Sequence, residues 1–266
     1  MRRLIAGPWV GELGWELLSW QGFLRKAAAN YDDIVVSTYE GHEPLYRDFC
    51  STFFPHNLKG DRDCLRLHGY DRAAYDALKA VLSSLKGDFL CPVAAVPKER
   101  QQFITYGFSN QVPVQDRADV LIHARHRSNR NPSHNWPEEK WKILCEALWQ
   151  AGVKVAAVGT SLESLCPSGT FDKRNIPMHE LMNMMAAAKV VVGPSSGPMH
   201  LASLCGAPHV VWTDTRVQPS IGATNKERYE KLWNPLKTPC TVLDMGWQPP
   251  VEPVLAAVLD LLQHRK

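Results

Sequence analysis

The stretch from Val191 to Ala202, VVGPSSGPMHLA, joins a short apolar run, a loop of small residues and the start of a helix. Gly193 and Gly197 allow the backbone to turn sharply and to approach a ligand closely. The loop leaves backbone N–H groups unpaired at the head of the helix, where the helix dipole favours a phosphate. The pattern fits a phosphate-binding loop, and it fits an ordinary helix N-cap about equally well.

Short apolar runs alternate with helical stretches on both sides of this loop, which is typical of parallel sheets covered by helices. In the C-terminal half we expect strands at 120–123, 153–158, 190–192 and 209–212, and helices at 137–150, 178–188, 199–205 and 251–263. In the N-terminal half we expect strands at 4–6 and 34–38, and helices at 17–30 and 70–85. Two consecutive βα domains therefore fit the chain.

The segment 111–117, which carries Pro and Gln residues, is interpreted as the linker. It predicts an N-terminal domain over 1–116, a C-terminal domain over 117–250 and a closing helix over 251–266. The length of 266 residues, with 45% hydrophobic and 21% charged residues, suits a globular protein with a large core.

The net charge of +3 argues against a broad polybasic surface for nucleic acid. The seven cysteines form no CxxC pair, so reduced thiols are expected. No apolar run is long enough for a signal peptide or a membrane span. We expect a cytoplasmic protein, with a peripheral place at a membrane surface left open.

The Val191–Ala202 segment, continued by Gly206-Ala207-Pro208, resembles the G-x-D-S-G-x-x-H-L-A…G-x-P signature of family 9 glycosyltransferases, the heptosyltransferase-like enzymes. Further segments resemble that family in the same order: Asn135-Trp136-Pro137-Glu138, Ala157–Thr160 with Glu163, and Arg228-Tyr229 with Trp233-Asn234-Pro235. The resemblance covers residues 120–245 and is much weaker over 1–115.

The resemblance implies an α/β, GT-B-like fold, with two Rossmann-like βα domains whose parallel sheets face a central cleft. The N-terminal domain would then bind the acceptor, and the C-terminal domain would bind a nucleotide-sugar donor. The donor-binding residues implied are Gly159, Glu163, Ser195, Ser196, Gly197, Pro198, Met199 and His200. Ordinary alternatives are a surface acid for Glu163 and a packed helix-start residue for His200.

Two positions depart from the family pattern. Ser195 replaces its acidic residue, so any contact from that carboxylate to the donor sugar is lost or supplied elsewhere. The lysine before Trp136-Pro137 is also absent. Arg125, Arg127 and Arg130 follow the strand ending at His123, in a run similar to the His-x-Arg-Arg motif of fucosyltransferases. Because an arginine can donate paired bonds to a diphosphate, we favour Arg125 and Arg127 as substitutes for the lysine over a solvated basic loop.

The family places a glycine-acid loop after its first strand, and its carboxylate acts as general base. Here Gly11-Glu12-Leu13-Gly14-Trp15-Glu16 offers two catalytic candidates, Glu12 and Glu16, with Glu12 ranked slightly above Glu16. An inverting transfer needs one carboxylate to take the acceptor proton and positive groups to stabilise the leaving diphosphate. For Glu16 the alternative is an acid that stabilises the first turn of a helix.

Trp9, Trp15 and Trp20 could line a sugar site, although the spacing of Trp20 favours the core. His123, His126 and His134 lack matching acids or cysteines, so we expect no metal site and a metal-independent reaction. No cofactor is expected beyond the nucleotide-diphosphate sugar as co-substrate. A glycan or lipid-linked saccharide is the expected acceptor, with a protein or a modified nucleobase left open. The alternatives are a degenerate sugar-nucleotide-binding scaffold and a UDP-sugar epimerase.

Overall fold

The computed structural model describes residues 1–59, 71–128, 131–219 and 222–264. The chain divides into two compact units, Met1–Phe103 and Ile104–Lys266. Each unit is an α/β structure built on its own parallel sheet. The α/β fold class predicted from the alternating pattern is therefore confirmed. Arg130, the third arginine of the basic run, lies outside the described residues.

The N-terminal unit holds a four-stranded parallel sheet in the order β3-β2-β1-β4. The strands are β1 (Arg3–Ala6), β2 (Asp33–Val36), β3 (Thr52–Phe53) and β4 (Asp88–Leu90). The chain moves from β1 to β2 and β3 on one side, and then returns to place β4 on the other side of β1. The switch point of this sheet, where the strand order reverses, therefore lies between β1 and its neighbour β4. Ligands bind at such a switch point in open α/β folds.

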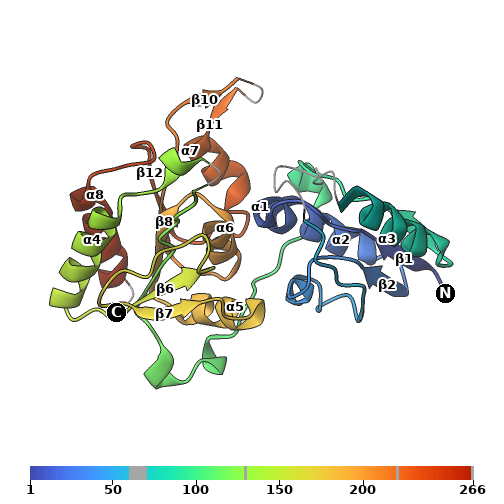
Figure 1. Ribbon diagram of the computed structural model, residues 1–266, viewed down its shortest axis with the longest axis horizontal. Helices are drawn as coiled ribbons and strands as arrows, with labels where there is room; N and C mark the ends of the chain where they lie inside the picture. Colours follow the sequence, from blue (N-terminus) through green and yellow to red (C-terminus); the bar gives the residue numbers. More distant parts are fainter. Residues whose placement is uncertain (60–70, 129–130, 220–221, 265–266) are drawn as a thin grey trace. The chain divides into compact units, whose positions relative to one another are not determined.

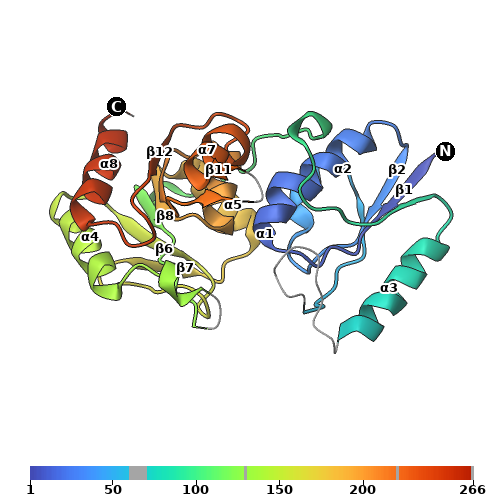
Figure 2. The ribbon, with the colours of Figure 1, turned by 90° about the horizontal axis from the view of Figure 1, so that it is seen from above.

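One continuous helical stretch follows β1, and it contains three kinds of turn. It consists of α1 (Leu13–Trp15), the π-helix η1 (Glu16–Trp20) and α2 (Gln21–Ala28). Helix α3 (Arg72–Ser84) packs its Leu82 against Ile5 and Val35 of the sheet. Figure 2 shows α2 and α3 on opposite sides of β1 and β2, so both faces of this sheet are covered. The described residues of the unit also include the short 3₁₀ turns η2 (Glu43–Leu45) and η4 (Lys98–Arg100).

The C-terminal unit holds six parallel strands in the order β12-β9-β8-β5-β6-β7. They are β5 (Val120–Ile122), β6 (Val155–Gly159), β7 (Phe171–Arg174), β8 (Val190–Pro194), β9 (His209–Trp212) and β12 (Cys240–Leu243). Strands β5, β6 and β7 form one half of the sheet, and strands β8, β9 and β12 form the other half. This is the doubly wound Rossmann order, and its switch point lies between β5 and β8.

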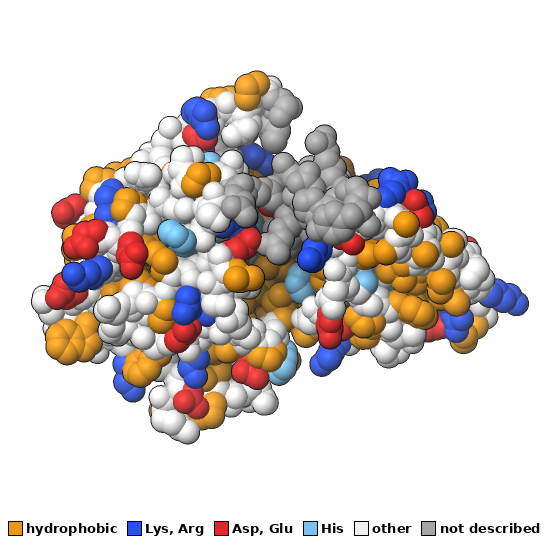
Figure 3. Space-filling view, viewed as in Figure 1, with side chains coloured by type: hydrophobic (Ala, Val, Ile, Leu, Met, Phe, Trp, Pro, Cys, Tyr) orange, Lys and Arg blue, Asp and Glu red, His pale blue; other side chains and the backbone are white. Residues whose placement is uncertain are grey.

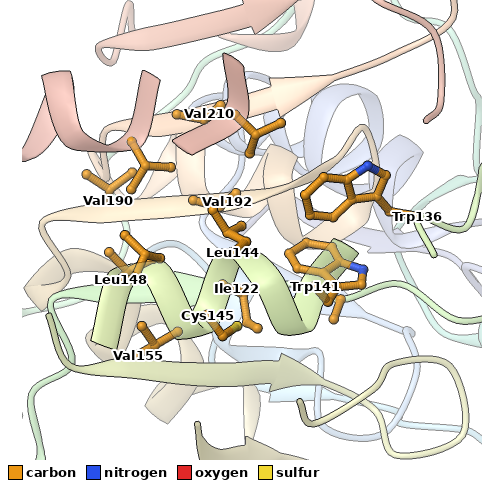
Figure 4. Packing of buried hydrophobic residues seen from close by; sticks show 14 of the residues in the cluster. Ile122, Trp136, Trp141, Leu144, Cys145, Leu148, Val155, Val190, Val192 and Val210 are labelled. Carbon is orange, nitrogen blue, oxygen red and sulfur yellow. The ribbon is translucent and has the colours of Figure 1, made fainter. Parts of the chain in front are cut away.

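Helices cover both faces of the six-stranded sheet (Figure 1). Helices α4 (Glu138–Gln150) and α8 (Val251–Gln263) pack together on one face, and α5 (Met178–Ala187) and α6 (Gly197–Leu204) on the other. In the core beneath α4, Trp141 and Leu144 pack over Ile122 and Val192, with Trp136 edge-on to Trp141 (Figure 4). The remaining elements are η5 (Ser109–Gln111), η6 (Val114–Asp116), η7 (Pro132–His134), β10 (Val217–Gln218), β11 (Ala223–Thr224), α7 (Asn225–Arg228) and the π-helix η8 (Tyr229–Trp233).

The division between the units comes earlier than the linker interpreted from the sequence. Residues 104–116 belong to the C-terminal unit: the Tyr106 amide donates to Leu204 O at 2.9 Å, and the Phe108 amide donates to Asn183 Oδ1 at 2.9 Å. Helix α8 lies in the core of the same unit and is no separate element. The Pro and Gln residues of 111–117 mark the local turns η5 and η6, whereas the packing changes at Phe103.

The surface carries both signs of charge. Figure 3 shows red and blue side chains interspersed over the C-terminal unit on the face drawn there. Among the described residues, no helix combines the length and the apolar character needed to cross a membrane.

Candidate active site

The loops that follow β5 and β8 start at the same edge of the C-terminal sheet. The His123 amide donates to Val192 O at 2.8 Å, and the Ser195 amide donates to Trp212 O at 2.8 Å. Because β5, β8 and β9 are parallel neighbours, the predicted arginines and serines leave the sheet beside one another at its switch point. This edge is the ligand-binding edge of doubly wound sheets.

Ser196 is the N-cap of α6, and its side chain makes no capping bond. Its Oγ is buried and has no hydrogen-bond partner among the described residues. A buried, unpaired hydroxyl is costly unless a ligand or water completes it. The first turn of α6, which begins at Gly197 and includes Pro198, points its backbone N–H groups and its positive dipole end to the same edge. The geometry suits a bound anion.

Met199 and His200 lie on the packed side of α6. Met199 is fully buried, and the His200 ring stacks on Tyr229 with centroids 5.4 Å apart and lies 5.2 Å from the Trp233 ring. Burial lowers the pKa of His200 to about 3, so the imidazole is neutral. The His200 Nδ1 atom is buried and has no partner among the described residues. His200 can therefore contribute a neutral hydrogen-bonding group, and no charge, to this region.

Asn135 connects the two described arginines of the basic run. Its Oδ1 accepts bonds from the Arg125 guanidinium and from the Arg127 amide, the latter at 3.0 Å. Its Nδ2 donates to Arg127 O at 2.9 Å. The Arg125 guanidinium, which is buried, also donates to Asn131 O at 3.1 Å. These bonds fix the position of the positively charged Arg125 guanidinium, and a fixed charge is what preorganised anion binding requires.

Arg127 and Glu163 form an ion pair, with Arg127 Nη2 3.0 Å from Glu163 Oε2. The structure thus brings together two of the predicted donor-binding residues. The pair also links the loop after β5 to the loop after β6, because the His126 amide donates to Glu163 O at 2.7 Å. The carboxylate of Glu163 offsets the charge of Arg127.

Gly159 ends β6 with a positive φ of 119°. A Cβ atom there would lie 2.8 Å from Ser164 Oγ and 2.9 Å from His123 Nδ1. Burial lowers the pKa of His123 to about 4. Gly159 is therefore required both by its backbone conformation and by the close approach of the loops after β5 and β6.

Two residues that the sequence analysis did not assign to the donor site, Asp214 and His134, lie at the same edge. Asp214 follows β9 and pairs with Arg216 at 2.6 Å, which holds the pKa of its carboxyl below the ordinary range. His134 stacks on Trp247, and burial, with a further contribution from Arg125, lowers its pKa to about 4. An acid directly after the apolar run 209–212 was the available signal for Asp214.

The two acids predicted in the N-terminal loop have different surroundings. Glu12 is the half-buried N-cap residue of α1. Glu16 is fully buried: its Oε1 accepts bonds from Thr38 Oγ1 at 2.5 Å and Tyr46 Oη at 2.7 Å, and its Oε2 lies 2.6 Å from His42 Nδ1. We call Glu16, Thr38, His42 and Tyr46 the acid cluster.

The other members of the acid cluster come from the chain after β2, so the spacing of the sequence gave no sign of them. Burial alone would lower the pKa of His42, but the charge and hydrogen bond of Glu16 raise it above its ordinary value. His56 lies nearby, and burial lowers its pKa to about 4.

Of the three tryptophans considered for a sugar site, Trp9 and Trp20 are fully buried and stack at 6.0 Å. They belong to the core, so the sugar-site interpretation of Trp9 is wrong. Trp15 is half-buried. Among the residues that the structure describes, no group of three or more His, Cys, Asp or Glu side chains is arranged to hold a metal ion.

Solved structures with the same fold include E. coli ADP-heptose lipopolysaccharide heptosyltransferase II, at 14% identity and a TM-score of 0.64 over 99% of both chains. A family 9 glycosyltransferase from Veillonella parvula matches at 13% identity and a TM-score of 0.64, over 99% of this chain and 98% of that one. E. coli heptosyltransferase WaaC with ADP matches at 16% identity and a TM-score of 0.59, over 98% of this chain and all of that one.

No family model and no curated protein matches the sequence. At these identities the likeness to solved structures concerns the fold, and it extends to the N-terminal half, where the sequence resemblance was weak. The chain therefore has the fold of the heptosyltransferase-like family 9 glycosyltransferases, with two Rossmann-like βα units of the GT-B class.

Proposed function

We propose that this protein is a glycosyltransferase that moves a sugar from a nucleotide-diphosphate donor to an acceptor hydroxyl. The observation that carries the proposal is the buried Ser196 hydroxyl, which has no partner among the described residues. Ser196 is the N-cap residue of α6, just after β8, and β8 lies next to β5, the strand that leads to Arg125. A hydroxyl, a helix N-terminus and a fixed guanidinium are the groups that a diphosphate requires.

In this proposal the diphosphate lies on the first turn of α6, Ser195 and Ser196, with Arg125 donating to its oxygens. These groups stabilise the charge that develops as the sugar–phosphate bond breaks, so the reaction proceeds without a metal ion. Arg127 holds the Glu163 carboxylate, which accepts hydrogen bonds from the ribose hydroxyls. The ion pair with Arg127 fixes the orientation of the Glu163 carboxylate.

The acceptor, a glycan or a lipid-linked saccharide in this proposal, is bound by the N-terminal unit. Its hydroxyl attacks the anomeric carbon from the face opposite the diphosphate, so the configuration inverts. Glu12 and the acid cluster around Glu16 form the basic centre that receives the hydroxyl proton. Glu12 and Glu16 both follow β1, the strand at the switch point of the N-terminal sheet.

The proposal is tested by the thermal unfolding of the whole chain with ADP, GDP, UDP, dTDP and CDP, with and without magnesium. ADP comes first because the E. coli WaaC structure holds ADP. A diphosphate at about 100 times its dissociation constant adds roughly 2.7 kcal/mol to the free energy of unfolding. We expect one diphosphate to raise the midpoint by several degrees, equally with and without magnesium.

Two variants and two controls locate the site. Arg125→Ala and Ser196→Ala should each remove most of the shift measured against their own ligand-free midpoint. Arg72→Ala and Ser168→Ala, at exposed positions of the described chain, should keep it. A chain that is stabilised by none of the five diphosphates would contradict the proposal.

A further inference from the structure

The acid cluster holds the imidazole of His42 in a fixed position. Thr38 and Tyr46 donate to one oxygen of Glu16, and His42 Nδ1 lies 2.6 Å from the other. A carboxylate that already accepts two hydroxyl donors also accepts from the imidazole, so Nδ1 carries the proton. In the neutral ring, Nε2 then holds the free electron pair.

The opposite side of the His42 ring is open to a substrate. No hydrogen bond of Nε2 occurs among the described residues, and 22% of the His42 side chain is exposed while Glu16 is 0% exposed. The buried Glu16 carboxylate therefore cannot contact an acceptor substrate, whereas the His42 imidazole that it holds can. The Tyr39 ring lies edge-on to the imidazole at 5.5 Å and restricts its rotation.

The backbone at Glu16 is also unusual. Glu16 opens the π-helix η1, where the Gln21 amide donates to Glu16 O across one extra residue. Single π-turns inside a helix occur frequently at functional sites, because they reposition a side chain at a local energetic cost. This turn places the Glu16 carboxylate beneath the segment after β2 that carries Thr38, His42 and Tyr46.

We propose that His42 Nε2 is the atom that accepts the acceptor proton, and that Glu16 is a positioning residue acting through His42. The inference rests on the proposed glycosyl transfer and specifies its basic centre. The acceptor O–H bond breaks with its proton going to Nε2, and the freed oxygen forms a bond to the anomeric carbon. The bond from that carbon to the diphosphate breaks, and the nucleoside diphosphate leaves with the electron pair.

The charged groups around His42 determine the pH at which it acts. Burial lowers the pKa of His42, whereas Glu16 on η1 and Glu43 on η2 raise it, with a net upward shift. His56, which follows β3, faces the same cluster together with Tyr39 and Tyr46 and is neutral because burial lowers its pKa to about 4. A base of this kind loses activity at a pH above the ordinary histidine pKa of about 6.5, whereas an ordinary carboxylate loses it near pH 4 to 5.

The test measures release of the nucleoside diphosphate by the full chain from ADP-heptose, UDP-glucose and GDP-fucose, with water as the acceptor, between pH 4 and 9. For the wild type we expect the acid limb of the kcat profile to have its midpoint above pH 6.5, the ordinary histidine pKa. His42→Ala should lower kcat by about a hundredfold or more with little change in the donor KM, and added imidazole should restore part of it. Glu16→Gln should move the acid limb to lower pH, since the imidazole loses its carboxylate.

His179→Ala is the matched control, because His179 is an exposed histidine on α5. It should keep the wild-type rate and pH profile. Nitrogen NMR of the wild type should show the neutral His42 ring protonated on Nδ1, whatever the donor. An active His42→Ala, an acid limb at pH 4 to 5, or a proton on Nε2 would overturn the role of His42 alone. A wild type that releases no diphosphate from any donor would overturn the proposed transfer and, with it, this role.

Discussion

Single side chains decide where chemistry is possible in this fold. Ser196 and Glu16 are both polar and shielded from water, yet the hydroxyl of Ser196 has no partner among the described residues and the carboxylate of Glu16 has three. A ligand that supplies the missing hydrogen bond stabilises an unpaired buried group, whereas a paired group is already stabilised by the bonds that hold it in place. We therefore assign ligand binding to Ser196 and positioning to Glu16.

At this residue scale, Gly159→Ala should destabilise the chain. The new Cβ would meet Ser164 and His123 at under 3.0 Å, at a φ of 119°. Backbone strain together with this overlap should cost about 2–4 kcal/mol in the free energy of unfolding. Urea unfolding followed by circular dichroism measures it.

Gly152→Ala is the matched control for Gly159→Ala. Gly152 has a φ of 74°, and a Cβ there would meet nothing within 4 Å. It should cost only the conformational penalty of about 1 kcal/mol. Equal losses for the two variants would show that the contact with His123 and Ser164 contributes nothing.

Among the secondary-structure elements, helices carry their packing on one side. Leu144 of α4 is fully buried in the core between α4, α8 and the sheet, whereas its neighbour Ile143 is 46% exposed. Successive residues on a helix point in directions about 100° apart, so adjacent positions such as Ile143 and Leu144 can have different environments.

Leu144→Ala should therefore lower the free energy of unfolding by about 2–5 kcal/mol, since it leaves a cavity in the core. Ile143→Ala should change it by less than about 1 kcal/mol. The midpoints of urea unfolding compare the two variants. A loss for Ile143→Ala as large as that for Leu144→Ala would mean that the outer face of α4 is covered in solution.

At the scale of the whole molecule, the chain contains two Rossmann-type units with switch points after β1 and β5. The candidate base belongs to the first unit and the candidate diphosphate site to the second. Each site is built from groups of one unit, so each can be tested in isolation.

A chain of residues 104–266 should fold alone and keep the diphosphate-induced thermal shift of the full protein. A chain of residues 117–266 should be less stable by several kcal/mol, because it lacks the buried Tyr106 and Val112 and the bond from Tyr106 N to Leu204 O. Urea unfolding of the two chains provides the comparison. Equal stabilities would support the boundary at 116/117 that the sequence suggested.

Acid should destabilise the protein well before its carboxylates are protonated. Burial lowers the pKa of His123 and His209 to about 4 and that of His200 to about 3. Unfolding returns these groups to about 6.5, so the unfolded chain binds more protons between about pH 6.5 and 4, and stability falls as the pH falls through that window. His42, with its raised pKa, acts in the opposite direction but is a single group.

Each such histidine contributes a slope of at most about 1 kcal/mol per pH unit within the window. The urea midpoint should therefore drop between pH 6.5 and 4.5 and change little between pH 7.5 and 6.5. His200→Phe should reduce the slope, since Phe has no group to protonate. A midpoint that stays constant down to pH 4.5 would contradict the prediction.

The sequence by itself determined the α/β class, the central strands and the main helices, because fully buried strands and amphipathic helices leave a local pattern in the chain. The helix predicted at 251–263 matches α8, and the strand predicted at 209–212 matches β9. Strands β3, β4, β7, β10, β11 and β12 escaped prediction. They are two to four residues long and only partly buried, so their sequences are not continuously apolar.

The tertiary structure alone decided which polar groups meet. The local motifs place Arg125 and Ser196 after two separate strands, and the sheet order makes those strands neighbours at the switch point. The acid cluster joins Glu16 to residues 22, 26 and 30 positions away in the chain, and no local pattern encodes such contacts. A carboxylate and an imidazole become a dyad only through the fold, because the free energy that aligns them comes from the packing of β1, β2 and the π-turn around them.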